Sequence, residues 1–214
     1  MNKEMINILI DNKTNQYFGD TTYKCIPPTF HKYKLFIISA YNFLKRNINI
    51  CCFCLIPNEL EITYQKVFET LKNIYKFNPI IFTLDFSKSI SKAITNIFPH
   101  CIQIKCLFHY IQALVKKLNK LGLIKKEYFV KNTEIIFNIK ALIFIEPSKI
   151  KKTYEMIESE YSDEEYYGKF FQYFRRQWKP FGKKAKIKFT PIWNHYDLFK
   201  NNDFDKKHFF WPIM

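Results

Sequence analysis

Glycine is scarce in this 214-residue chain, with only four residues, Gly19, Gly122, Gly168 and Gly182. A phosphate-cradling loop needs several glycines close together, so the sequence excludes a Gly-rich nucleotide-binding loop. Neither a GxSxG nor an HExxH motif occurs. Serine hydrolases of the nucleophile-elbow type and zincin proteases are therefore poor interpretations.

Long apolar runs are also missing. No run approaches the ~18 residues that a membrane-spanning helix needs, so we expect no membrane partner. The apolar segment 5–10 is too short for a secretory signal and is followed by polar residues. We therefore expect a reduced, intracellular state for the six cysteines. They are Cys25, Cys51, Cys52, Cys54, Cys101 and Cys106.

Acidic residues are few: 19 Asp and Glu stand against 34 Lys and Arg, a formal net charge of +15. Six of the acids fall within 155–165, and a basic run follows over 175–188. Such a run fits a surface that contacts nucleic-acid phosphates. A solvated face combined with compositional bias explains it equally well. The candidate DNA-contacting residues are Arg175, Arg176, Lys183, Lys184 and Lys186.

Apolar residues make up 48% of the chain and aromatic residues 19%, enough for one substantial core. Short apolar runs predict strands over 35–40 and 50–56 with a turn at 47–49, and further strands over 79–84 and 101–106. Helical spacing predicts helices from an Asn58 cap with Glu61 in a capping box to about 75, over 90–97 and over 107–121 with Gly122 as its cap. The alternation predicts an α/β fold with a mixed sheet flanked by helices, and 128–178 as helical.

Three acidic residues occupy distinctive settings: Asp20, Asp85 and Asp205. Asp85 follows a buried strand, where sheet proteins place ligands, although it could instead cap the next helix. Asp20 taken alone resembles a residue in a polar turn, and Asp205 an ordinary surface acid. Carboxylates that a fold gathers from distant positions are how enzymes hold Mg²⁺ for phosphodiester chemistry.

A Cys-x2-His element, Cys106 and His109, stands between the second and third acids. A zinc site needs about two more ligands, and the cysteines of 51–54 are the available pair. On a strand, Cys52 and Cys54 would share one face and Cys51 the other, which suits core packing better and disfavours zinc. A position for His109 beside the carboxylates or the DNA backbone is more attractive, with a structural hydrogen bond as the alternative.

Several sequence blocks follow one another in an order that resembles the catalytic core of Mutator-like element (MULE) transposases, especially animal relatives that accompany FLYWCH-type zinc fingers. The blocks are FGDTTYKCIPPTF at 18–30, CLIPN at 54–58, DF at 85–86, FP at 98–99, CLFHYIQAL at 106–114, WN at 193–194 and NNDFD at 201–205. Each block alone is weak, and the ordered set spans about 17–208.

This resemblance implies a ribonuclease-H-like fold in a single core over 1–214, with the sheet domain in about 14–125 and 190–214. It implies a helical insertion over about 126–180, before the third acidic residue. It also implies a DDE mechanism in which Asp20, Asp85 and Asp205 bind Mg²⁺ or Mn²⁺, with Cys106 and His109 beside the active site. The implied partner is DNA at transposon ends, the implied location is the nucleus, and homo-oligomerisation is left open.

Two positions depart from the family pattern. Thr21 stands where the opening motif has Gly, and Asp205 stands where Glu is usual, which shortens the side chain by about 1.5 Å. Mg²⁺ demands near-ideal octahedral geometry, so either change would impair the site. We therefore keep two alternatives: a truncated, inactive or domesticated nucleic-acid-binding remnant of the same fold, and a metal-dependent nuclease of cellular origin.

Overall fold

The computed structural model describes residues 3–10, 16–22, 25–42, 47–123, 129–161, 165–178 and 194–196. The chain divides into two compact units, Met1–Cys106 and Leu107–Met214. The first unit contains α1 (Lys3–Ile10), β1 (Gln16–Thr22), the 3-10 turn η1 (Pro28–Phe30), β2 (Lys34–Asn42), β3 (Asn47–Ile56), α2 (Glu61–Tyr75), β4 (Ile81–Leu84), α3 (Lys88–Ile97) and β5 (Ile102–Lys105).

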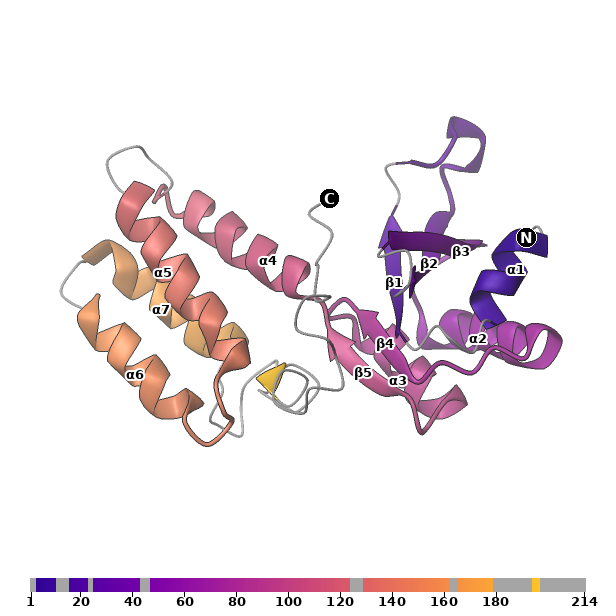
Figure 1. Ribbon diagram of the computed structural model, residues 1–214. Helices are drawn as coiled ribbons and strands as arrows, with labels where there is room; N and C mark the ends of the chain where they lie inside the picture. Colours follow the sequence, from indigo (N-terminus) through magenta and orange to yellow (C-terminus); the bar gives the residue numbers. More distant parts are fainter. Residues whose placement is uncertain are drawn as a thin grey trace. The chain divides into compact units, whose positions relative to one another are not determined.

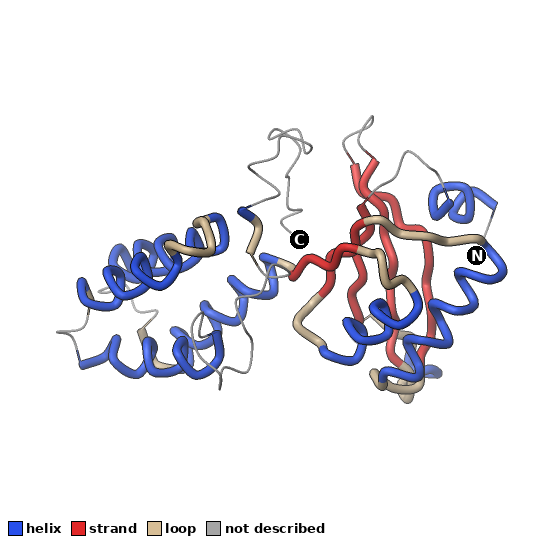
Figure 2. Tube along the Cα trace, turned by 90° about the horizontal axis from the view of Figure 1, so that it is seen from below, coloured by secondary structure: helices blue, strands red, loops and turns tan. Residues whose placement is uncertain are grey.

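The strands of the first unit form one five-stranded sheet in the order β3-β2-β1-β4-β5 (Figure 1). The β1–β2 and β2–β3 pairs are antiparallel. The β1–β4 and β4–β5 pairs are parallel. Figure 2 shows these strands with helices packed beside them. This mixed sheet flanked by helices confirms the predicted α/β class and is compatible with a ribonuclease-H-like fold.

An aromatic core joins the sheet to α2 and α3. Phe68 of α2 is fully buried, and its ring centroid lies 5.9 Å from that of Phe36, 5.8 Å from that of Phe82 and 5.9 Å from that of Phe98. Tyr64, Phe68 and Leu71 recur at helical spacing and are all buried, so one face of α2 packs on the sheet. Burial of these large side chains is the main stabilising contribution in this unit.

Two aromatic rings pack directly against the backbone of β1 at Gly19, so this position has no room for a side chain. A Cβ at this position would lie 2.6 Å from Cε1 of Phe82 and 3.1 Å from Cε2 of Phe36. Both rings are fully buried in the close-packed core, so neither can move away without strain.

We expect Gly19→Ala to reduce the free energy of unfolding by about 1–3 kcal/mol, the usual range for overpacking a core. Gly168→Ala is the matched control, because a Cβ there meets nothing within 4 Å and the residue is exposed in α7. Replacing an exposed helical glycine should instead stabilise by about 0.5–1 kcal/mol. Urea unfolding of both variants measures the difference, and two shifts of the same sign would contradict the steric explanation.

The second unit is helical, with α4, α5, α6 and α7 lying beside one another in Figure 1. Its elements are α4 (Leu107–Lys120), α5 (Phe129–Ala141), the 3-10 turn η3 (Leu142–Phe144), α6 (Ile150–Glu160) and α7 (Glu165–Trp178). The Tyr110 hydroxyl donates to the carbonyl oxygen of Ile139 at 3.0 Å, which joins α4 to α5. The rings of Tyr154 and Phe174 stack at 5.3 Å, which joins α6 to α7.

Helices thus occupy the predicted helical region within 128–178. The predicted return of the chain to the sheet over about 190–214 lies outside the described residues except for 194–196, so the insertion stays a prediction. No helix in the described part of the chain is both long and apolar enough to cross a membrane.

Some predicted boundaries are wrong. The segment 47–49 begins β3 and is not a turn. Asn58 is not the N-cap of α2, because the helix begins at Glu61 after Leu60. Instead, its Oδ1 accepts hydrogen bonds from the Leu60 N–H at 3.1 Å and from the Thr63 hydroxyl at 2.6 Å.

Candidate functional site

The first two predicted acids lie on neighbouring parallel strands in the middle of the sheet. The last paired row of β1 and β4 joins Gly19 to Leu84. Asp20 follows Gly19 in β1, and Asp85 follows Leu84 at the end of β4. Since adjacent strands are about 4.8 Å apart, the backbones at these two positions are side by side.

The alternation of side chains places both carboxylates on the same side of the sheet. Tyr17 and Gly19 face the aromatic core, so Asp20 points to the opposite face and is exposed. Phe82 and Leu84 are likewise core residues, which puts Asp85 in phase with Asp20. Two carboxylates on one side of a strand end are hard oxygen donors of the kind that Mg²⁺ and Mn²⁺ require.

Local hydrogen bonds orient each carboxylate. One Asp85 oxygen, Oδ1, accepts from the Ser87 N–H at 2.8 Å. Asp20 Oδ1 accepts from the N–H of Thr21 at 2.9 Å. The Asp85 contact lies just before α3, whose N-cap residue Ser87 makes no side-chain capping bond. Asp85 is therefore not the N-cap of this helix, and its carboxylate instead accepts from the backbone of the N-cap residue.

A lysine that no sequence motif singles out contacts the backbone of Asp85. The Lys105 ammonium, at the end of β5, donates to the backbone oxygen of Asp85 at 2.8 Å and to the Ser91 hydroxyl at 3.3 Å. Burial lowers the pKa of Lys105 to about 8, and the Asp85 charge offsets part of this effect. The sequence signal was its position at the end of the next parallel strand, one row from Asp85.

Tyr64 is a second neighbour that sequence reasoning missed. Its hydroxyl lies 2.9 Å from the Thr21 hydroxyl. Burial raises the pKa of Tyr64 to about 12. The charges of Glu59, Asp85 and Asp20 also raise it, while the Thr21 hydrogen bond lowers it. Asp20 and Asp85 therefore both lie within electrostatic reach of one hydroxyl group, which agrees with the strand register.

One further predicted site residue lies at this strand end, because the Cys106 N–H donates to the Leu84 carbonyl oxygen at 2.8 Å. Asp205, Lys183, Lys184 and Lys186 lie outside the described residues. His109 belongs to the second unit, whereas Cys106 ends the first. The placement of His109 beside the carboxylates therefore stays a prediction.

The two described residues of the basic run are exposed on α7, and one of them is paired. Arg175 donates from Nη1 to Glu158 Oε1 of α6 at 2.6 Å. Arg176 is the next residue on the same exposed helical turn. An Arg–carboxylate pair this exposed stabilises the unit only slightly, and it removes part of the positive charge that a phosphate would meet.

Among the described residues, no group of three or more His, Cys, Asp or Glu side chains could hold a metal ion. The described site thus offers two of the three carboxylates expected of a DDE centre. Both fit a hard divalent cation by donor chemistry and by placement at the ends of the central strands.

The family match covers most of the sheet unit and the first residues of α4. Residues 8–113 match the model of the MULE transposase domain. The match includes Asp20, Asp85, Cys106 and His109, and it supports the MULE family for this part of the chain. A MULE transposase domain indicates a transposase-related function and, in general terms, DNA binding. No curated protein matches the chain.

Proposed function

We propose that this chain is a DDE-type MULE transposase core that cleaves and joins DNA strands at transposon ends. The observation that carries the proposal is the strand register. Gly19 pairs with Leu84, so the residues that follow them, Asp20 and Asp85, are neighbours within the MULE-matching segment. Asp205, in the NNDFD block, would supply the third carboxylate. The finer assignment to animal, FLYWCH-associated relatives rests on the ordered sequence blocks.

Asp20 and Asp85 would hold Mg²⁺ or Mn²⁺ through their carboxylate oxygens. Divalent ions supply Lewis-acid activation of the attacking oxygen and stabilisation of the leaving oxygen in an in-line displacement. The backbone contact from Lys105 fixes the turn that carries Asp85. His109 would act near the reacting strand, and the basic run would contact phosphates.

DNA is the proposed partner, and the basic run is the proposed contact surface. Arg175, Arg176, Lys183, Lys184 and Lys186 would neutralise phosphates, so affinity should fall steeply as salt rises. A nuclear location follows from this substrate. Assembly on two DNA ends would be served by a homo-oligomer.

The second candidate is a catalytically inactive, domesticated or remnant DNA-binding protein of the same fold. The Thr21–Tyr64 hydrogen bond favours it, because a side chain fills the position where the related motif has Gly. The hydrogen bond ties the strand beside Asp20 to α2. The shorter acid at position 205 points in the same direction.

A cleavage assay separates these candidates. The purified chain is incubated with Mn²⁺ or Mg²⁺ and labelled DNA that carries the terminal inverted repeats flanking genomic copies of the gene. Strand cleavage or joining that requires the cation and the repeat supports the transposase. Binding to DNA at moderate salt without cleavage supports the remnant, and the absence of both contradicts each candidate.

The double variant Thr21→Gly, Asp205→Glu restores the family pattern at both departures. If the natural chain is a decayed enzyme, we expect cleavage to rise at least about 10-fold, since one tenfold step corresponds to only about 1.36 kcal/mol of transition-state stabilisation. The matched control is Thr22→Gly, Asp203→Glu, which makes the same changes at nearby positions. An equal rise in the control would show that the motif positions are not responsible.

A further inference from the structure

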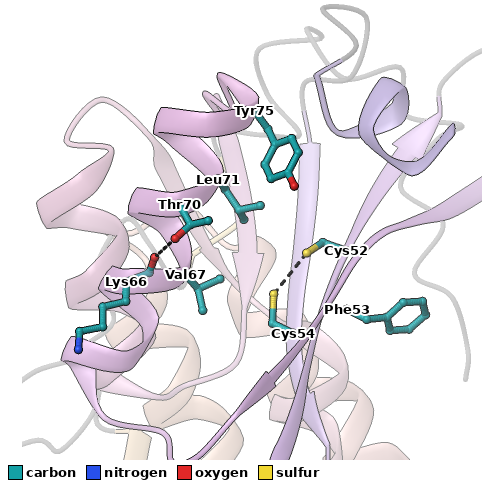
Figure 3. Close-up of a pocket in the computed structure, with 8 residues that line it drawn as sticks. All are labelled: Cys52, Phe53, Cys54, Lys66, Val67, Thr70, Leu71 and Tyr75. Carbon is teal, nitrogen blue, oxygen red and sulfur yellow. Dashed lines mark hydrogen bonds between the residues drawn. The ribbon is translucent and has the colours of Figure 1, made fainter. Parts of the chain in front are cut away.

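Two cysteines on β3 form a close pair away from the carboxylates. Cys52 and Cys54 lie on the same face of the strand, and their Sγ atoms are 3.3 Å apart (Figure 3). Cys51 is the additional residue of a β-bulge, because Ile38 pairs with Cys52 and Ser39 pairs with Ile50. After the bulge, side chains of β3 alternate so that those of Cys52 and Cys54 both face α2.

A pocket of about 340 Å³ opens onto the two sulfur atoms. Val67, Leu71 and Tyr75 of α2 line its apolar wall, and the exposed Lys66 also borders it. Figure 3 shows both sulfur atoms on the pocket side of β3, while the neighbouring Phe53 points away from it. The thiols are therefore reachable by a small solute although Cys52 is only 5% exposed.

The hydrogen bond between the sulfur atoms makes the pair unequal. It lowers the pKa of the Cys52 thiol and raises that of Cys54, whose burial acts in the same direction. A cation that binds both sulfur atoms as thiolates displaces the thiol protons that they carry, so binding becomes stronger as pH rises.

The extended strand disfavours a direct disulfide between Cys52 and Cys54. Two residues along a strand span about 6.4–6.8 Å between Cα atoms. That span is at the upper limit of about 6.8 Å for disulfides, whose sulfur atoms must also approach to about 2.05 Å. An ion between the sulfur atoms leaves the strand extended and its ladder to β2 intact.

We propose that Cys52 and Cys54 form a two-thiolate site for a soft monovalent cation of the Cu(I) class. Thiolates are the ligands that select such ions over hard cations. One monovalent cation and two thiolates leave a net negative charge at the pocket. The ligand chemistry is opposite to that of Asp20 and Asp85, so the proposal does not depend on the transposase proposal.

Anaerobic titration of the reduced full-length chain with Cu(I), in competition with a chromogenic Cu(I) chelator, tests the site. We expect one high-affinity equivalent for the wild type. Cys52→Ser and Cys54→Ser should each weaken it by at least about 100-fold, because loss of a mere supporting group already costs about 10–100-fold. The matched controls are Cys51→Ser, on the same strand, and Cys25→Ser, an exposed thiol. Both should keep the wild-type affinity.

Three outcomes would overturn the site. They are equal Cu(I) affinity in the wild type and the two variants, an equal loss in the Cys51→Ser control, and a Cys52–Cys54 disulfide as the resting form of the protein. Circular dichroism checks folding of each variant. If Cys52→Ser is unfolded, Cys54→Ser and Cys54→Ala replace it in the test, because Cys54 is only half-buried. Full Cu(I) affinity in these two variants would refute the proposal.

Discussion

Asp20→Asn and Asp85→Asn should each abolish cation-dependent DNA cleavage while leaving the fold intact. Each change replaces a charged oxygen ligand by a neutral amide of the same shape. Metal-ion stabilisation of a transition state contributes several kcal/mol, so we expect a loss of roughly 10³-fold or more at about 1.36 kcal/mol per factor of ten. The measurement is the initial rate of strand cleavage with Mn²⁺ on cognate terminal DNA.

The control for this prediction is Glu69→Gln, which neutralises an exposed acid on α2. It changes the net charge by the same amount and should keep the wild-type rate. The amide oxygen introduced by Asp85→Asn can still accept the Ser87 N–H, so thermal unfolding of this variant should remain close to that of the wild type. Full cleavage activity in either Asp variant would end the proposal of a two-carboxylate metal centre.

Phe68→Ala should destabilise the sheet unit strongly, because this side chain holds the sheet and two helices together. Phe68 is fully buried and its ring meets those of Phe36, Phe82 and Phe98. Removing it loses the transfer free energy of the ring and leaves a cavity among three other rings. Such changes typically cost about 3–5 kcal/mol, a large part of the total stability of a domain.

Urea unfolding, followed by circular dichroism, measures this loss. Phe53→Ala is the matched control, because the same side chain on β3 is 52% exposed. Surface substitutions usually change stability by less than about 0.5 kcal/mol. Similar shifts in the two variants would mean that the aromatic core is not the main source of stability in this unit.

Elements with a strong apolar pattern were predicted from the sequence. The run before Asp85 is the fully buried strand β4, and the segments predicted as the next helix, strand and helix are α3, β5 and α4. Gly122 follows α4 with a φ of 72°, the left-handed conformation expected of a glycine C-cap. Burial dictates these patterns, so the sequence alone carries them.

The strand that carries Asp20 was not recognised, since FGDTT resembles a polar turn. In β1 the glycine accommodates rings from β2 and β4, and the polar residues lie at the end of the strand. Both facts depend on neighbours that are distant in sequence, which overrides local propensity. The family blocks, rather than the local pattern, identified Asp20.

The neighbours of the carboxylates were not predicted from the sequence. Lys105 and Tyr64 each reach the site through contacts between separate elements. Neither stands in a motif that marks such a role. The resemblance to MULE transposases implied that Asp20 and Asp85 lie close together. The register of β1 with β4 gives a physical reason for that proximity. Asp205 and the basic residues beyond 178 stay predictions.

The strand order has a consequence for when metal affinity arises during folding. β1 and β4 are neighbours in the sheet although β2, β3 and α2 lie between them in the chain. Pairing strands that are so far apart in the sequence costs loop-closure entropy before their contacts can form. A divalent ion that requires both carboxylates would therefore recognise only the finished sheet, raise its melting temperature by mass action, and ignore a fragment that stops short of β4.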